Sequence, residues 1–361
     1  MVANKFHDIL LFNRGVAQLV AHTAGGREVA GSSPVSPTIN KYLKYCYYSF
    51  PRKIRLACIL LSEVIMVTET FNIHKSDFPS TFAFEYSVNN YENINYKLYR
   101  HERRRLQLEL LKFQEWCIKE KRSVAIALEG RDAAGKGSTA AYLTQYLNPR
   151  YSKIISLGVP TKSQMRSWLR IHQSMMPDLG QTVIFDRSWY SRAMIQPVMG
   201  YCSMNQYKYF LKNVNDWEYE QIESGTDIIK IYLSVSQESQ NLRLQNRQNS
   251  PLKYWKYSQN DRTAIEKWHL YTYFKERMFS VTSTDYAPWY IIKSDNKLSA
   301  QLCVMNLILS KFDYDDKNQL NLGETIASGG EINHIYLDGV RFDNLTSEQI
   351  EVLERFKIHA D

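Results

Sequence analysis

The sequence has few cysteines, and their spacing forms neither a metal-binding nor a disulfide pattern. Five occur among 361 residues, at positions 46, 58, 117, 202 and 303, and none belongs to a C-x-x-C pair. Disulfide-rich secreted domains and structural zinc sites carry closely spaced cysteines. The scatter therefore predicts a cytoplasmic protein with reduced cysteines, and it argues against a zinc site.

Long apolar runs are also missing from the sequence. The best candidate, 57–67, follows three basic residues and contains Glu63. It is shorter than the ~20 apolar residues that a membrane-spanning helix needs, and it begins too late in the chain for a secretory signal. We therefore expect no membrane partner.

The main part of the chain has little excess charge. The formal net charge is +8, but residues 1–65 hold eight Lys or Arg against three Asp or Glu, which leaves +3 for residues 66–361. A strongly basic body, as nucleic-acid binding requires, is thereby excluded, and we expect no nucleic acid partner. One basic run, 103–105, is either a solvated helix face or a contact for a polyanion.

Residues 1–65 lack the periodicity of helices and strands. Their Ala17-Gln-Leu-Val20 and Gly31-Ser-Ser-Pro34 are peptides that the D and TΨC arms of a transfer-RNA gene would encode if they were translated. We expect that the protein begins at Met66 or a nearby codon and that 1–65 is spurious. The alternative is an authentic Ser/Pro-rich disordered arm, and the DNA sequence of the gene distinguishes the two.

The strongest motif joins an apolar run to a glycine-rich turn. Residues 124–129 are typical of a buried strand, and Gly130-x-x-x-x-Gly135-Lys136 follows before a short helical stretch. This spacing predicts a loop that binds phosphate through backbone N–H groups, a helix N-terminus and a mobile lysine. A glycine-rich turn with an idle lysine is the alternative. The residues expected at the phosphates are Gly130, Ala133, Ala134, Gly135, Lys136, Gly137 and Ser138.

The loop departs from the common pattern at one position. The Ser or Thr that usually follows the lysine and binds Mg²⁺ is Gly137 here, and Ser138 comes one residue late. Because carboxylate oxygens are good Mg²⁺ ligands, Asp132 inside the loop is a candidate to bind the metal instead.

Strand and helix patterns alternate beyond the loop. Apolar strands are predicted at 153–157, 181–186, 227–235 and 289–293 with helices between them, and a helix over about 95–121 precedes the loop. Such alternation predicts parallel strands covered by helices on both faces. We expect a three-layer α/β/α fold with a five-stranded parallel sheet over 124–312. A helical segment over 66–123 would pack on it, and a tail would follow over 313–361.

A second group of candidates lies at the end of the strand 181–186. Asp186 ends this apolar run, and Arg187 and Arg192 follow. Ligands gather at the carboxyl ends of parallel strands, where the loop also lies. We predict that Asp186 binds a metal, with a helix N-cap as the alternative. The two arginines are predicted to contact phosphates, to which guanidinium groups donate in pairs.

A third group is basic and occupies 236–262. Pro251 interrupts its helical pattern, which predicts two helices joined by a turn. Such a lid can close over a substrate and exclude water, and a solvated pair of basic helices is the alternative. The candidates on this lid are Arg247, Lys253, Lys256 and Asp261.

Together these stretches resemble the polyphosphate kinase 2 family, and most closely its single-domain members that phosphorylate nucleoside diphosphates. The order and spacing agree over roughly 90–315, and Gly137 with Asp132 belongs to that family's form. The matching segments are Glu129-Gly-Arg-Asp-Ala-Ala-Gly-Lys-Gly137, Leu147-Asn-Pro149, 185–190 with Arg192, 198–202, 250–256, 287–289 and 295–297.

The resemblance implies a P-loop kinase-like fold with a helical lid. It implies reversible, Mg²⁺-dependent transfer of the terminal phosphoryl group of inorganic polyphosphate to a nucleoside diphosphate, ADP or also GDP. Asp132 and Asp186 would bind two Mg²⁺ ions, which Mn²⁺ can replace, while Lys136 and Arg187 hold phosphates. Arg247 and Lys253 would reach the transferring group from the lid, and a homo-oligomer, dimer or tetramer, is the expected assembly.

Several positions depart from that family and leave alternatives open. His172 stands where an arginine is usual, and His269 and Leu270 replace an acidic pair. One alternative is an ATP-dependent kinase that acts on a nucleoside monophosphate, against which Gly137 argues. The other is a binding protein for polyphosphate or nucleotide that has lost turnover. Against it stands the intact catalytic set Asp132, Lys136, Asp186, Arg187 and Arg247.

Overall fold

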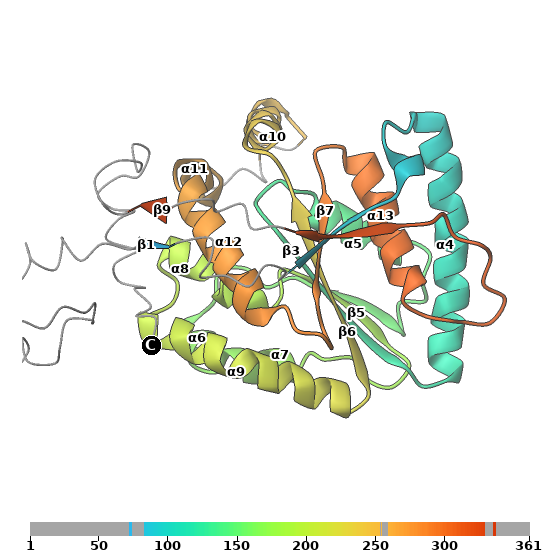
Figure 1. Cartoon of the computed structure of the whole chain (residues 1–361), viewed down its shortest axis with the longest axis horizontal. Coiled ribbons are helices and arrows are strands. Elements are labelled where there is room, and N and C mark those ends of the chain that lie inside the picture. The colour runs from blue at the N-terminus through green and yellow to red at the C-terminus, as the bar shows by residue number, and fades with distance from the viewer. Residues whose placement is uncertain (1–71, 74–82, 253, 255–258, 329–334, 337–361) are drawn as a thin grey trace, which may run out of the picture. The chain divides into compact units, whose positions relative to one another are not determined.

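The computed structural model describes residues 72–73, 83–252, 254, 259–328 and 335–336. The interpretation of 1–65 and the candidates Lys253 and Lys256 lie outside the described residues. The main body is one sheet with helices against both faces (Figure 1). Within the described ranges this sheet has seven strands, in the order β4-β5-β3-β6-β7-β2-β8.

All five predicted strands are confirmed, and neighbours among them pair in parallel. Their bounds are β3 Ser123–Gly130, β4 Ser152–Ile155, β5 Thr182–Asp186, β6 Thr226–Ser234 and β7 Trp289–Lys293. In the register, Leu128 of β3 faces Asp186 of β5, and Gly130 faces Leu233 of β6. The phosphate loop and Asp186 therefore begin at the same edge of the sheet.

The prediction of five strands is nevertheless wrong in number. β2 Ala83–Ser87 pairs with β7 in parallel, and β8 Glu324–Ser328 pairs with β2 in the antiparallel direction. Neither segment has the apolar run of a buried strand. The sequence of β2 is Ala-Phe-Glu-Tyr-Ser, and β8 is exposed at four of its five positions. Both strands depend on pairing between distant parts of the chain, which a local sequence pattern does not record. A separate short pair joins β1 Asn72–Ile73 to β9 Ile335–Tyr336.

Helices fill most of the chain between the strands. Their bounds are α4 Tyr96–Lys119, α5 Lys136–Thr144, α6 Lys162–Arg166, α7 Trp168–Gln173, α8 Ile195–Met199, α9 Met204–Glu223, α10 Gln237–Asn249, α11 Gln259–Glu266, α12 Trp268–Thr282 and α13 Lys297–Ser310, with 3₁₀ turns η2 Asn89–Tyr91 and η3 Trp189–Arg192. Among these described helices, none combines the length and the apolar character that crossing a membrane requires.

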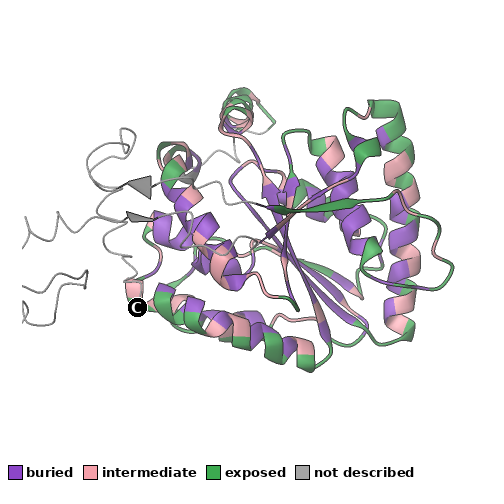
Figure 2. Cartoon of the chain, in the orientation of Figure 1, coloured by how far each residue is buried: buried purple, intermediate pink, exposed green. Residues whose placement is uncertain are grey.

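The side chains of β3 divide the core into two clusters. Ala125 and Ala127 belong to a cluster with residues of α9 and α12. Val124, Ile126 and Leu128 belong to a cluster with residues of α4, α5 and α13. Successive residues of a strand point to opposite faces of a sheet, and both faces are covered here, so the whole strand is buried (Figure 2).

The helix α4 is the one predicted over about 95–121. Asn95 caps its first turn by accepting a hydrogen bond from the backbone N–H of Leu98. The chain beyond α13 returns to this helix, where the Tyr314 hydroxyl donates to Glu109 at 2.9 Å and the Asn318 side-chain amide donates to it at 2.7 Å. The beginning of the predicted tail is therefore part of the folded body.

Candidate functional site

The loop between β3 and α5 has the backbone that its glycines predict. Gly130 has a φ of +148° and Gly135 a φ of +112°, a range that side chains disfavour. A Cβ atom on Gly130 would also lie 2.6 Å from the carbonyl oxygen of Leu233, so β3 and β6 approach too closely for any other residue. No side chain caps α5 at Gly135, which leaves the first N–H groups of this helix to a ligand or to water.

Lys136 is buried at the start of α5, and its amine folds back on the loop. Nζ donates to the carbonyl oxygens of Gly130 at 2.7 Å and Arg131 at 2.9 Å. Burial, and then the positive charge of Arg187, lowers the pKa of Lys136, and the carboxylates of Asp132 and Asp186 act in the opposite direction. The predicted lysine and the two predicted metal ligands therefore lie within electrostatic reach of one another.

Asp132 and Arg187 form an ion pair that joins the loop to the residue after β5. Asp132 is 7% exposed, and its Oδ2 has no hydrogen-bond partner among the described residues. Arg187 has a φ of +67°, and its backbone N–H donates to the carbonyl oxygen of Leu128 at 3.2 Å, which continues the pairing of β5 with β3 by one residue. The structure thus brings together two of the predicted catalytic residues.

The Asp186 carboxylate lies next to Gly137. A Cβ atom on residue 137 would lie 2.9 Å from Oδ2 of Asp186, closer than side chains tolerate. The glycine therefore provides the space that the Asp186 carboxylate occupies. This gives a physical reason for the departure from Ser or Thr, because the carboxylate lies where a side chain at 137 would begin.

The carboxylates of Asp132 and Asp186 could hold a divalent cation together with a substrate. Among the described residues, no group of three or more His, Cys, Asp or Glu side chains could hold a metal ion by itself. Mg²⁺ usually takes one or two carboxylates and fills its other positions with water and substrate phosphates. The unpartnered oxygen of buried Asp132 fits such an ion.

The sequence patterns did not identify Glu129 as a functional residue. It ends the apolar part of β3, where burial raises the pKa of its carboxyl group. Its Oε1 accepts from the backbone N–H of Ser188 at 2.7 Å and from the Ser188 hydroxyl at 2.9 Å. Glu129 therefore fixes the turn that presents Arg187, and a charged residue inside an apolar strand was the signal for it.

Two residues of α10 hold the loop by its backbone. Gln240 donates to the carbonyl oxygen of Asp132 at 2.8 Å, and Arg243 donates to that of Ala133 at 3.1 Å. The other end of the Arg243 guanidinium donates to the carbonyl oxygens of Ser294 at 2.5 Å and Asp295 at 2.7 Å, after β7. Gln240 and Arg243 are three residues apart, so the sequence predicts that they share one face of the helix. The sequence does not indicate that both contact the backbone of the loop.

The predicted lid candidates are only partly described. The helices α10 and α11 lie on either side of Pro251 as expected, and Lys253 and Lys256 lie outside the described residues. Arg247 donates to Asp261 at 3.0 Å, which joins the two helices. The described contacts do not join Arg247 to the phosphate loop.

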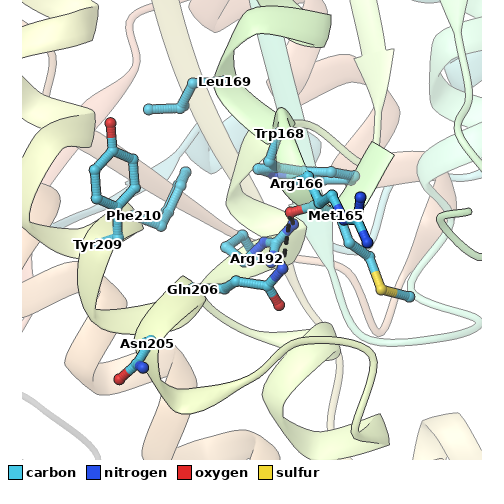
Figure 3. A pocket seen from close by; sticks show the side chains of 9 residues that line it. All are labelled: Met165, Arg166, Trp168, Leu169, Arg192, Asn205, Gln206, Tyr209 and Phe210. Atoms are coloured by element: carbon cyan, nitrogen blue, oxygen red, sulfur yellow. Dashed lines mark hydrogen bonds between the residues drawn. The ribbon is translucent and has the colours of Figure 1, made fainter. Parts of the chain in front are cut away.

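Arg192 is placed away from the loop. It is buried on η3, where it donates to the carbonyl oxygen of Met165 at 3.0 Å and lies 5.1 Å from the ring centre of Trp168. It lines a separate cavity of about 310 Å³ (Figure 3). Although it follows Arg187 by only five residues, Arg192 contacts Met165 and Trp168, whereas Arg187 contacts Asp132.

His172 belongs to the core. It is fully buried beside Trp168, Phe185 and Trp189, and its Nδ1 lies 2.9 Å from the carbonyl oxygen of Trp168. Burial lowers the pKa of His172 to about 4, so the ring is neutral at pH 7. This departure from the family pattern adds no charge near the loop.

The chemistry of this arrangement is that of phosphate handling. A backbone cradle, a buried lysine, an arginine and two carboxylates meet at one edge of the sheet. Transfer of a phosphoryl group needs positioning and positive charge more than covalent or acid–base catalysis. The groups at this edge supply both requirements.

The chain is similar to known proteins over much of its length. The chain is 38% identical over 227 residues to the GDP-polyphosphate phosphotransferase of Mycolicibacterium smegmatis, a match that covers 63% of this chain and 80% of that protein. It is 40% identical over 227 residues to NDP-polyphosphate phosphotransferase 2 of Ruegeria pomeroyi, which covers 63% of this chain and 66% of that protein.

A solved structure, polyphosphate kinase 2 from Arthrobacter aurescens TC1, matches with a TM-score of 0.55 at 27% identity and covers 60% of this chain and 81% of that chain. The sequence pattern of the family described as Polyphosphate kinase 2 (PPK2) matches residues 93–320, which is more than half of the chain and includes the loop 130–138 and Asp186. The chain therefore belongs to the polyphosphate kinase 2 family.

Proposed function

We propose that the protein transfers the terminal phosphoryl group of inorganic polyphosphate to a nucleoside diphosphate, with ADP as acceptor and GDP as a second acceptor, and that the transfer is reversible. The observation that carries this proposal is the convergence of Asp132, Lys136, Asp186 and Arg187 at the ends of β3 and β5. The names of the two relatives, for GDP and for nucleoside diphosphates, support the same acceptor class.

The residues of the site suit this reaction without a general base. The attacking oxygen of a nucleoside diphosphate is already ionised, so no proton has to be removed from it. The remaining task is to hold two anions together and to neutralise charge on the transferring group. Lys136 would leave the loop carbonyls for a phosphate, and Arg187 would exchange part of its contact with Asp132 for another phosphate oxygen.

We propose that Asp132 and Asp186 hold Mg²⁺ together with the substrates, as two ions that Mn²⁺ can replace. When bound, Mg²⁺ would supply positive charge that offsets the negative charge of the phosphate groups. The unpartnered Oδ2 of Asp132 and the space beside Gly137 support this assignment.

We propose that α10 and α11 act as a lid that carries Arg247 and Lys253 to the transferring group. Arg247 is already paired with a negative charge on Asp261, and a phosphate offers the same charge. Closure would exchange one anionic partner for the other, with Lys256 close in sequence. Gln240 and Arg243 would keep the base of the lid on the loop throughout.

The decisive test is ATP formation from ADP with long-chain polyphosphate and Mg²⁺. ADP, GDP and AMP are assayed side by side, and a parallel reaction contains EDTA. We expect product from the diphosphates and none with EDTA. Product chiefly from AMP would indicate a nucleoside monophosphate kinase, and binding without product from any nucleotide would indicate a protein that has lost turnover.

We also propose a cytoplasmic location and a homo-oligomer, dimer or tetramer. The described cysteines Cys117, Cys202 and Cys303 are free and buried, as expected in a reducing compartment. The outer side of α4 exposes the apolar residues Leu98 and Leu108 at 56% and 57%, which supports an interface there. Light scattering during size-exclusion chromatography measures the assembly directly.

A further inference from the structure

Arg192 carries a buried charge that has no negative partner. It is 1% exposed, and its Nε and Nη1 have no hydrogen-bond partner among the described residues. Its Nη2 donates to the carbonyl oxygen of Met165, and the side chain of Cys202 lies within hydrogen-bonding reach of the guanidinium group. No Asp or Glu is found among the described residues that line its cavity.

The neighbours of Arg192 offset this charge only in part, through the ring of Trp168, whose centre lies 5.1 Å from the guanidinium carbon. The titratable group that acts on it among the described residues is the thiol of Cys202, and burial raises the pKa of Cys202 to about 12. That thiol is therefore neutral at pH 7. Burying a cation is costly unless it is paired, and the pair Lys230–Glu218 in the same core, at 2.8 Å, shows the usual solution.

The cavity at Arg192 has the composition of a ligand site. Its volume is about 310 Å³, and its walls include the rings of Trp168 and Phe210 (Figure 3). Arg166, an exposed residue at the end of α6, adds a second positive charge to the lining, and Asn205 adds an amide. Positive charge deep inside with aromatic carbon around it suits a phosphate group joined to an organic part, or a phosphate chain.

We propose that this cavity binds a phosphate-bearing anion, whose negative charge is balanced by the guanidinium groups of Arg192 and Arg166. The anion has two sources in the proposed reaction, a nucleotide or a segment of polyphosphate beyond the one at the loop. The inference takes these two ligands from the proposed function, but it concerns binding alone and does not require transfer.

The first test is the stability of Arg192→Met in phosphate-free buffer. Methionine has a similar length without the charge, and the carbonyl oxygen of Met165 keeps its bond from the Gln206 amide at 3.1 Å. If Arg192 serves to bind a ligand, its replacement by methionine leaves the midpoint of thermal unfolding unchanged or raises it. A clear fall in the midpoint would assign Arg192 to structure and would overturn the proposal.

The second test measures binding apart from the loop, in chains that all carry Lys136→Ala. ADP and tripolyphosphate are titrated by calorimetry into Lys136→Ala alone, with Arg192→Met added, and with Arg170→Met added as a control. Arg170 is an exposed arginine of the adjacent helix α7 and does not line the cavity. Hydrogen bonds to charged groups contribute enough to change affinity by about tenfold.

We expect Arg192→Met to weaken binding of at least one ligand about tenfold and Arg170→Met to change it less than twofold. Loss for ADP alone identifies a nucleotide, and loss for tripolyphosphate identifies the phosphate chain. The ligand should also protect the backbone amides of 165–169 from hydrogen exchange. Equal affinities with and without Arg192→Met for both ligands would overturn the proposal, whatever the outcome of the ATP assay.

Discussion

Glu218 and Lys230 form a fully buried ion pair of 2.8 Å, and each of them holds a side chain that follows Arg187. Glu218 accepts from the indole N–H of Trp189 at 2.9 Å. Lys230 lies 3.1 Å from the hydroxyl oxygen of Tyr190 and donates to the carbonyl oxygen of Thr282 at 2.6 Å. The buried ion pair thus stabilises the turn that follows Arg187, through Trp189 and Tyr190.

We predict that Lys230→Met destabilises the protein by about 3–5 kcal/mol, because Glu218 would keep a buried charge without its partner. Denaturant unfolding measures this loss. The double variant Lys230→Met/Glu218→Gln removes both charges and keeps an acceptor for Trp189, so most of the stability should return. A single variant that loses less than about 1 kcal/mol would contradict the role of the pair.

We predict that Gly137→Ser folds normally but loses activity by about tenfold or more, although serine is the common residue after the lysine of such loops. Its Cβ would displace the Asp186 carboxylate, which lies 2.9 Å from that position, and displacing the metal ligand that we propose should slow catalysis. The Mg²⁺ concentration for half-maximal activity should rise. Gly158→Ser is the matched control, since a Cβ at 158 meets no atom within 4 Å.

We predict that Lys136→Ala and Asp186→Ala each reduce turnover by about a hundredfold or more while the protein still folds, because each removes a charge expected at the transferring group. Initial rates of ATP formation and circular dichroism spectra measure the two effects. Wild-type turnover in both variants would show that the site lies elsewhere.

We predict that His172 makes the protein sensitive to acid. Burial lowers its pKa from 6.5 to about 4 in the folded state, so the unfolded chain binds a proton first. Stability is fully present above pH 6.5 and falls as the pH drops towards 4, by about 3 kcal/mol from this residue. His172→Gln should remove that part of the loss in denaturant titrations at pH 7 and pH 4.5. His101→Gln, at an exposed position of α4, should leave the loss unchanged.

The sequence predicted those parts of the site in which the functional residues directly follow an apolar strand. The loop and Asp186 each follow an apolar strand, and parallel pairing brings such strand ends together, so Asp132, Lys136 and Arg187 could be expected near one another. Arg192 was predicted at the phosphates for its charge, but the direction of its side chain depends on a single 3₁₀ turn.

Other features could not be predicted because their partners are distant or belong to the backbone. Glu129 accepts a hydrogen bond from the backbone N–H of Ser188, and Arg243 donates to a backbone carbonyl oxygen of the loop. Because nearly every residue type has these backbone groups, the sequence does not reveal such partners. The same holds for the number of strands. The segment of β8 is mainly polar and becomes a strand only because the open edge of β2 lies beside it.

The pairing of β2 with β8 places Ala83, the first residue of one strand, directly opposite Ser328, the last residue of the other. A turn of two residues is enough to join antiparallel neighbours in that register. The first and last residues of the segment 83–328 therefore lie side by side. A circular permutant that joins Ser328 to Ala83 through such a turn, and that has its new termini at an exposed turn elsewhere, should form the same sheet. The phosphate loop would stay intact, and the new termini would offer a site for fusion to another protein.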